Sequence, residues 1–152
     1  MHGPGVLEDY AMSYLYYDDA HLLDLLTRTR TVAVVGASAN PDRASHEITA
    51  YLIQQGYEVY PVNPALGGAP LLGRPSYYGL TSVPVPIDLV DIFRRSEDVG
   101  PIVDEAILIG AKAIWMQLGV RDDGAAARAE AAGLTVIMDR CPKIERRRLG
   151  LG

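Results

Sequence analysis

The stretch "TVAVVGASANPDR", residues 31–43, decides the fold. Five strand-forming, mostly apolar residues end at Gly36, and small residues and then Arg43 follow. Such a continuous run predicts a central strand that is buried on both faces of a parallel sheet. A small-residue turn that leads into a helix is typical of a phosphate-binding strand–turn–helix unit. The dinucleotide fingerprint G-x-G-x-x-G is nevertheless absent, because "ASAN" follows Gly36.

The same alternation of strands and helices continues to the end of the chain. "YEVYPV", "PIDLVDIF", "KAIWMQ" and "LTVIMD" read as four further strands, with helical patterns between most of them. Residues 62–87 are the exception, since prolines and glycines there replace a regular helix. We therefore expect an α/β, Rossmann-like, doubly wound parallel sheet of five strands in the order 3-2-1-4-5. The predicted strand centres are Val34, Val59, Val90, Ile114 and Val136.

Three helix boundaries have recognisable signals. Ser96 is placed to cap the helix after the third strand, with acidic residues in its first turn. Asp122 or Asp123 precedes an alanine-rich helix, and Pro142 suits the first turn of the last helix.

Length and composition favour one globular domain. The chain has 152 residues, of which 49% are hydrophobic and 22% charged. This length and this hydrophobic fraction suit a domain with a single core. We expect residues 1–18 to form an N-terminal extension and residues 19–152 to form the domain. Tyrosines at 10, 14, 16 and 17 make the extension a candidate contact with a homodimer partner or another protein. The alternative is that it covers the edge of the sheet.

Several classes of function are disfavoured by what the sequence lacks. The net charge of −5 argues against nucleic-acid binding, and the basic run at 146–148 is read as a solvated helix end. One cysteine and three scattered histidines give no disulfide and no metal-binding pattern. We find no signal peptide and no apolar run of the ~18 residues that a membrane helix needs. The expected location is the cytoplasm.

Candidate binding residues follow the predicted strands. The carboxyl ends of parallel strands share one rim, where ligands of open α/β sheets bind. At this rim the turn after the first strand offers backbone N–H groups and the positive end of a helix to an anion. The residues that follow the strands are Gly36, Ala37 and Ser38 with Arg43 beyond them, then Val62, Asn63 and Pro64, then Phe93 and Arg94, then Gln117, Leu118 and Gly119, and finally Asp139, Arg140 and Cys141.

The second strand narrows the ligand class. A NAD site expects Asp or Glu about 20 residues beyond the glycines to bind the ribose hydroxyls. Here the corresponding residues are Val62, Asn63 and Pro64. Asn63 tolerates an adenosine that carries an additional phosphate, so NADP and coenzyme A (CoA) both fit.

Several motifs together resemble a known family. "VAVVGAS", "GYEVYPVNP", "VDIFRRSEDV", "WMQLGV" and "DRCPKIE" occur in the order and spacing of the small stand-alone bacterial CoA-binding proteins. These proteins are similar to the CoA-binding Rossmann domain of the succinyl-CoA synthetase α subunit. The resemblance runs from about Asp19 to Leu149. It implies that CoA is the ligand and that Gln117 and Gly119 lie towards its pantetheine arm. The other residues that the resemblance implies for CoA binding are Gly36, Ala37, Ser38, Arg43, Val62, Asn63, Pro64, Phe93 and Arg94.

The sequence gives no assigned reaction. There is no Ser-His-Asp order and no nucleophile elbow. Asp91 lies within an apolar strand and is expected to be buried and hydrogen-bonded, and Cys141 is read as apolar filler rather than as a thiol that exchanges with CoA. We favour a non-catalytic sensor or carrier of CoA or acyl-CoA. The alternatives are an NADP-dependent oxidoreductase and a subunit of an acyl-CoA ligase or transferase.

Overall fold

The structure is a computed structural model, and it describes residues 16–152. Tyr10, Tyr14 and most of the predicted N-terminal extension lie outside the described residues. The extension and its proposed contact with a partner therefore stay predictions. The first described helix, α2, begins at Asp19.

Five parallel strands form one sheet, as the sequence predicts. Their apolar side chains are buried almost throughout, because helices cover both faces. The strands are β1 (Thr31–Val35), β2 (Glu58–Val62), β3 (Leu89–Ile92), β4 (Ala113–Met116) and β5 (Thr135–Ile137). The helices are α2 (Asp19–Arg28), α3 (Ala44–Gln54), α4 (Val99–Leu108), α5 (Asp123–Ala131) and α6 (Pro142–Arg148).

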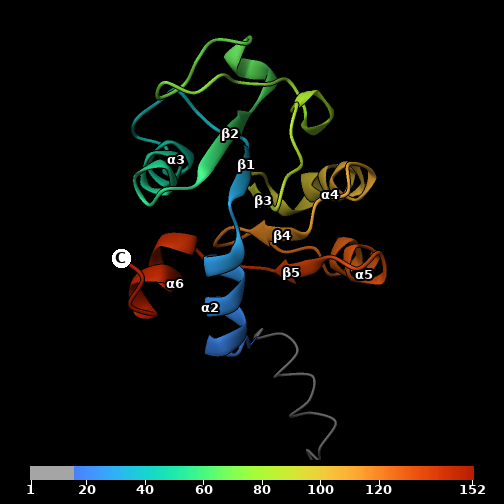
Figure 1. The fold of residues 1–152 in the computed structure, drawn as a ribbon. Coiled ribbons are helices and arrows are strands. Elements are labelled where there is room, and N and C mark those ends of the chain that lie inside the picture. Colours follow the sequence, from blue (N-terminus) through green and yellow to red (C-terminus); the bar gives the residue numbers. More distant parts are fainter. Residues whose placement is uncertain (1–15) are drawn as a thin grey trace, which may run out of the picture.

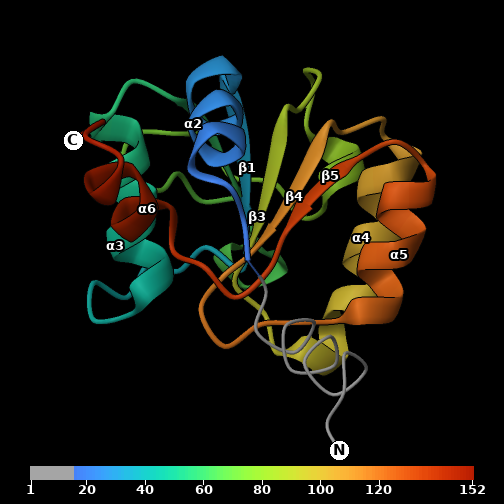
Figure 2. The same ribbon diagram turned by 90° about the horizontal axis from the view of Figure 1, so that it is seen from below.

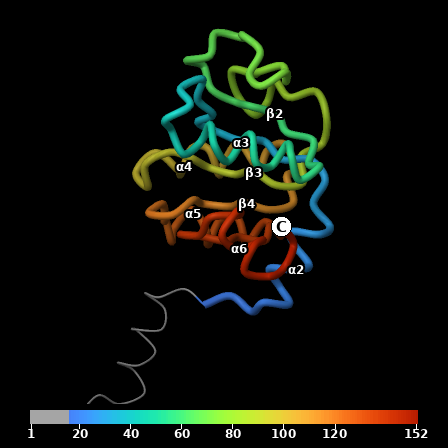
Figure 3. The backbone as a smooth tube through the Cα atoms, turned by 90° about the vertical axis from the view of Figure 1, so that its left-hand side faces the viewer, coloured from blue at the N-terminus to red at the C-terminus, as the bar shows by residue number. Residues whose placement is uncertain are grey.

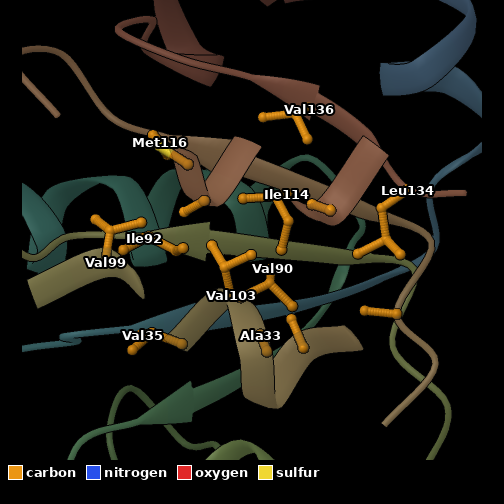
Figure 4. Close-up of a cluster of buried hydrophobic side chains, with 14 of the residues drawn as sticks. Ala33, Val35, Val90, Ile92, Val99, Val103, Ile114, Met116, Leu134 and Val136 are labelled. Carbon is orange, nitrogen blue, oxygen red and sulfur yellow. The ribbon is translucent and has the colours of Figure 1, made fainter. Parts of the chain in front are cut away.

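The helices make two layers around the sheet (Figures 1 and 2). Helices α2, α3 and α6 cover one face, and α4 and α5 cover the other. The core beneath α4 and α5 is built mainly from alanine, valine and isoleucine side chains, with Val90, Ile92 and Ile114 pointing from the sheet towards Val99 and Val103 of α4 (Figure 4). The opposite face holds the single tryptophan, which is fully buried.

The predicted strand order is wrong. The observed order is β2-β1-β3-β4-β5, so β3 pairs with β1 and β2 lies at the edge. Figure 3 shows β2 at one end of the stack, with β3 and β4 following it. The order reverses between β1 and β3, and this point of reversal is where ligands of doubly wound sheets bind.

Pro61 gives a physical reason for the edge position of β2. The backbone of β2 alternates its hydrogen bonds between its two sides: Val62 O accepts from Gly36 N on the side of β1. Pro61 O accepts from Tyr77 N on the opposite side, where another strand would otherwise lie. Because proline has no N–H, it cannot complete a ladder on that side, and prolines in sheets are confined to edge strands.

The helix boundaries follow the sequence signals with one exception. Asp122 caps α5, since its Oδ1 accepts from Ala125 N at 2.9 Å, and Pro142 opens α6. Ser96 does not cap α4, which begins three residues later after a 3-10 turn, η3 (Ser96–Asp98). Its hydroxyl oxygen instead accepts from Arg121 N at 2.9 Å, which joins the loops after β3 and β4.

The crossover from β2 to β3 holds two 3-10 turns and no α-helix, in agreement with its proline-rich and glycine-rich sequence. These turns are η1 (Pro64–Leu66) and η2 (Leu80–Ser82). Within residues 16–152, no helix is both long enough and apolar enough to cross a bilayer.

The basic run near the C-terminus is not simply a solvated helix end. Arg146 is buried, and its guanidinium donates to the hydroxyls of Tyr51 and Tyr57 and to Leu151 O. Arg148 is partly exposed and pairs with Glu145 and Asp19. The run therefore fastens α6 to α3 and α2, an arrangement that charge counting along the sequence does not reveal.

Candidate functional site

A hollow lies at the carboxyl edge of the sheet where the strand order reverses. Its volume is about 450 Å³, and its walls come from the turn after β1, the first turn of α3, and the ends of β2 and β3. We call it the arginine hollow, because Arg43 and Arg94 both line it. Its other lining residues are Gly36, Ser38, Asn40, Ala44, Ser45, Asn63, Ala65 and Phe93.

Gly36 is required by the backbone at this point. Its φ is +92°, in the region that residues other than glycine rarely adopt. A Cβ at this position would lie 2.2 Å from the carbonyl oxygen of Phe93. The glycine therefore allows the end of β3 to approach the turn after β1 closely, and this contact exists only because β3 is the neighbour of β1.

Ala37 and Ser38 occupy different surroundings. The side chain of Ala37 is fully buried in the core under α3, so it does not line the hollow. Ser38 lines the hollow, and its Oγ accepts from Asn40 N at 3.0 Å. Its carbonyl oxygen accepts from His46 Nδ1 at 2.8 Å, which fastens the turn to α3.

The two arginines of the hollow have no acidic partner within residues 16–152. Arg43 precedes the first residue of α3 and makes no side-chain hydrogen bond with the described residues. Arg94 donates only to a neutral amide, that of Asn63, at 3.1 Å. Exposed arginines elsewhere behave differently, since Arg95 and Arg128 both pair with aspartates. Two unneutralised cations beside a helix N-terminus favour an anionic ligand.

Asn63 holds the walls of the hollow together. Its Nδ2 donates to Ala37 O at 2.8 Å, and its Oδ1 accepts from Ala65 N at 3.0 Å as well as from Arg94. The amide thus joins the turn after β1 to the crossover segment and orients one arginine. The sequence predicted that Asn63 contacts the ligand itself, and the structure adds this positioning role.

A larger cavity of about 770 Å³ adjoins the arginine hollow. The two share four lining residues, which are Arg43, Ala44, Phe93 and Arg94. Apolar side chains make up half of the other lining residues, and the rest are one buried amide and three charged side chains. These residues are Ile48, Leu118, Val120 and Cys141, then Gln117, and then Glu47, Arg95 and Asp98. A cavity of this size that combines apolar walls with a few polar groups is typical of small-molecule sites.

The carboxylates that line the larger cavity are already neutralised. Glu47 pairs with Lys143 at 2.9 Å, and this hydrogen bond lowers the pKa of Glu47. Asp98 pairs with Arg95 at 3.1 Å. The rim therefore keeps a positive character around Arg43 and Arg94, although the whole chain is acidic.

Asp91 is buried, as the sequence predicted. Its side chain is 0% exposed, and its Oδ1 accepts from Gln117 Nε2 at 2.6 Å. Its Oδ2 has no hydrogen-bond partner among the described residues. Burial raises the pKa of Asp91 to about 7, and the hydrogen bond from Gln117 opposes this shift only in part.

Besides Ala37, three of the predicted site residues line neither cavity. Val62 is buried in the core, and Pro64 begins the 3-10 turn after β2. Gly119 lies in the loop after β4, where its N donates to Asp139 Oδ1 at 2.7 Å. Their predicted ligand contacts stay predictions.

Sequence reasoning missed part of the α3 wall of the site. Ala44 and Ile48 of α3 line the larger cavity, and Ala44 also lines the arginine hollow. They stand four residues apart at the start of the helix, which is the spacing of one helix face, and this signal was readable. No group of three or more histidine, cysteine or acidic side chains within residues 16–152 is placed to hold a metal ion.

The fold and the hollow define an α/β domain with a glycine turn and two arginines at the point of strand reversal. The chain belongs to a family with such a domain: the model of the CoA binding domain matches residues 30–147. This match confirms the resemblance that the sequence motifs indicated.

Individual relatives agree with this membership. The chain is 38% identical over 125 residues to "Uncharacterized protein YneT" of Bacillus subtilis, covering 82% of this chain and 91% of that protein. A solved structure, "hypothetical protein from Pyrococcus horikoshii OT3", is 37% identical, with a TM-score of 0.84 over 90% of this chain and 94% of the other. The α subunit of acetate–CoA ligase (ADP-forming) I of Pyrococcus furiosus is 32% identical over 96 residues, which cover 60% of this chain but 21% of the subunit.

Proposed function

We propose that this protein binds CoA or an acyl-CoA along the carboxyl edge of its sheet. One observation carries the proposal: two arginines that have no acidic partner among residues 16–152 line a hollow together with a glycine turn, and this hollow adjoins a larger cavity with many apolar side chains. CoA has the matching form, since it joins a triply phosphorylated adenosine end to a long, largely uncharged arm. Membership of the CoA binding domain family supports the same ligand.

The shape of the site suggests how the parts of CoA are distributed. In this proposal, phosphate oxygens accept from Arg43, Arg94 and the backbone near Gly36, close to the N-terminus of α3. The pantetheine arm extends past Phe93 into the larger cavity, towards Gln117 and Cys141. Asn63 stands where a NAD-binding protein carries an acidic residue, so NAD lacks its usual ribose acceptor.

The role that we favour is that of a non-catalytic sensor or carrier. The described residues offer a turn and a cavity that suit an anionic ligand with an uncharged arm, and the acidic side chains that line the cavity are paired. The alternative, a subunit that presents CoA to a ligase partner, is favoured by the similarity to the Pyrococcus furiosus ligase subunit. The matched region covers 21% of that subunit.

A ligand panel tests the proposal. Isothermal titration calorimetry and thermal melts are run on the full chain with CoA, acetyl-CoA, dephospho-CoA, NADP and NAD. We expect CoA and acetyl-CoA to bind most tightly and to raise the melting temperature, because a ligand that binds only the folded state stabilises it. Binding of NAD or NADP as tight as that of CoA would overturn the assignment. If neither CoA nor acetyl-CoA binds, the proposal is wrong.

A further inference from the structure

Asp91 and Gln117 form a buried pair at the wall of the larger cavity. Asp91 sits in the middle of the sheet, between Val34 of β1 and Trp115 of β4 in the strand register. Gln117 follows β4, is 6% exposed, and lines the cavity. Their hydrogen bond of 2.6 Å connects the interior of the sheet with the site.

The direction of this hydrogen bond determines which polar atom faces the cavity. An ionised carboxylate only accepts hydrogen bonds, so Gln117 must turn its Nε2 towards Asp91. The other end of the amide, Oε1, has no hydrogen-bond partner within residues 16–152. This oxygen is not fully enclosed by the protein either, whereas Asp91 Oδ2 is. Gln117 therefore offers the larger cavity a hydrogen-bond acceptor.

A protonated Asp91 would require the opposite orientation. Its O–H would be a buried donor, and such donors need an acceptor. The described residues supply no partner for Oδ2, and Oδ1 contacts only Gln117. The available acceptor is Gln117 Oε1, which can reach Asp91 if the amide turns over. Gln117 would then present Nε2, a donor, to the cavity.

We propose that Asp91 is a positioning residue that decides whether Gln117 offers an acceptor or a donor to the pantetheine arm. The inference rests on the proposed function, since it concerns the amide-containing arm of CoA. With Asp91 ionised, an amide N–H of the arm donates to Gln117 Oε1, and with Asp91 protonated this bond is lost. CoA affinity is therefore coupled to the charge of a residue that the ligand never touches.

The proton equilibrium of Asp91 lies where such coupling matters. Burial raises the pKa of Asp91 to about 7, so both forms are populated near neutral pH. Helix α2 turns only leucines towards this face. The titratable groups that α3 and the α6 segment turn inward, wholly or in part, are His46, Tyr51, Cys141, Lys143, Glu145 and Arg146. None of them shifts the pKa of Asp91. Burial raises this pKa, and the hydrogen bond from Gln117 lowers it in part.

The test compares CoA affinity at pH 8 and pH 6 in the wild type and in Asp91→Asn. The variant has nearly the same shape but cannot titrate, and titration of the CoA phosphates affects both proteins equally. We expect wild-type affinity to fall about three- to tenfold more than that of the variant on going to pH 6, which is the range of one hydrogen bond. Gln117→Met should abolish this additional fall.

A truncated ligand separates positioning from a general effect on the fold. Adenosine 3′-phosphate 5′-diphosphate keeps the phosphates of CoA but lacks the amide arm. Its affinity should have the same pH dependence in the wild type and in Asp91→Asn. If Asp91→Asn changes the binding of both ligands alike, Asp91 is merely structural and the inference is overturned.

The remaining outcomes are also decisive. If wild-type protein binds CoA with the same pH dependence as Asp91→Asn, the positioning role is wrong while the proposed function stands. If wild-type protein binds neither CoA nor the truncated ligand, the proposed function falls and the inference falls with it. A carboxyl carbon resonance of Asp91 that titrates near pH 7 in the free protein, together with the pH difference, supports the inference.

Discussion

Asn63→Asp exchanges one nitrogen for an oxygen in the wall of the arginine hollow. In the native structure Nδ2 donates to Ala37 O at 2.8 Å, and Oδ1 accepts from Arg94 at 3.1 Å. The substituted carboxylate has no donor, so it loses the bond to Ala37 and forms an ion pair with Arg94. We expect this change to cancel the charge that Arg94 offers to a phosphate, without removing the arginine.

The magnitude follows from these contacts. A hydrogen bond between charged partners contributes about 1.5–3 kcal/mol. Loss of the Arg94 contact should therefore weaken CoA binding roughly 10- to 150-fold, since about 1.4 kcal/mol is a factor of ten. The free energy of unfolding should change less. The lost bond to Ala37 costs about 1 kcal/mol, and the new ion pair with Arg94 offsets about 0–1 kcal/mol of it.

Calorimetry with CoA, together with thermal melts by circular dichroism, measures both effects. Asn40→Asp is the matched control, because Asn40 also lines the hollow and its Oδ1 accepts from Asp42 N at 3.0 Å, which a carboxylate can still do. Asn40→Asp adds the same negative charge to the rim, at a side chain that makes no hydrogen bond with Arg94. The loss of CoA affinity in this control therefore measures only the repulsion between the new charge and the phosphates. Equal losses of CoA affinity in the two variants would refute the proposed coupling between Asn63 and Arg94.

Three further changes test the site and the fold. Arg94→Ala should weaken CoA binding about 10- to 150-fold in calorimetry. Arg128→Ala, which removes the ion pair between α5 and Asp104 of α4, should leave CoA binding unchanged, and equal affinities of both variants would contradict an arginine clamp. Gly36→Ala should lower the free energy of unfolding by about 1–3 kcal/mol in urea, because its Cβ would meet Phe93 O at 2.2 Å, and an unchanged midpoint would show that reasoning to be wrong. Burial raises the pKa of Asp91 from 3.8 to about 7. The protonated side chain therefore contributes fully to the free energy of unfolding below pH ~4, and this contribution, on the order of 4 kcal/mol, is lost as the pH rises to about 7. Asp91→Asn should remove that decline in urea unfolding between pH 4 and 8, and an identical profile in the variant would disprove it.

Much of the candidate site was readable from the sequence because strand ends carry their own signals. Gly36, Arg43 and Arg94 follow runs of strand-forming residues, and the common rim of a parallel sheet brings them together. The sequence did not show that the side chain of Ala37 points into the core, or that Asn63 is bonded on three sides. Such facts depend on which way a turn is rotated, and residue type alone does not determine that rotation.

The sequence by itself determined the class of fold, because apolar runs alternating with helical patterns cannot bury their side chains except in a parallel sheet covered on both faces. Only the tertiary structure decided that β3 lies beside β1. Both β2 and β3 are apolar enough to lie either at the edge or inside the sheet. The edge position of β2 arises from the missing N–H of Pro61 on its outer side. That choice places Phe93 against Gly36 and Arg94 within reach of Asn63. The site therefore depends on a strand order that local residue patterns leave undetermined, since the order is set by hydrogen bonds between segments far apart in the chain.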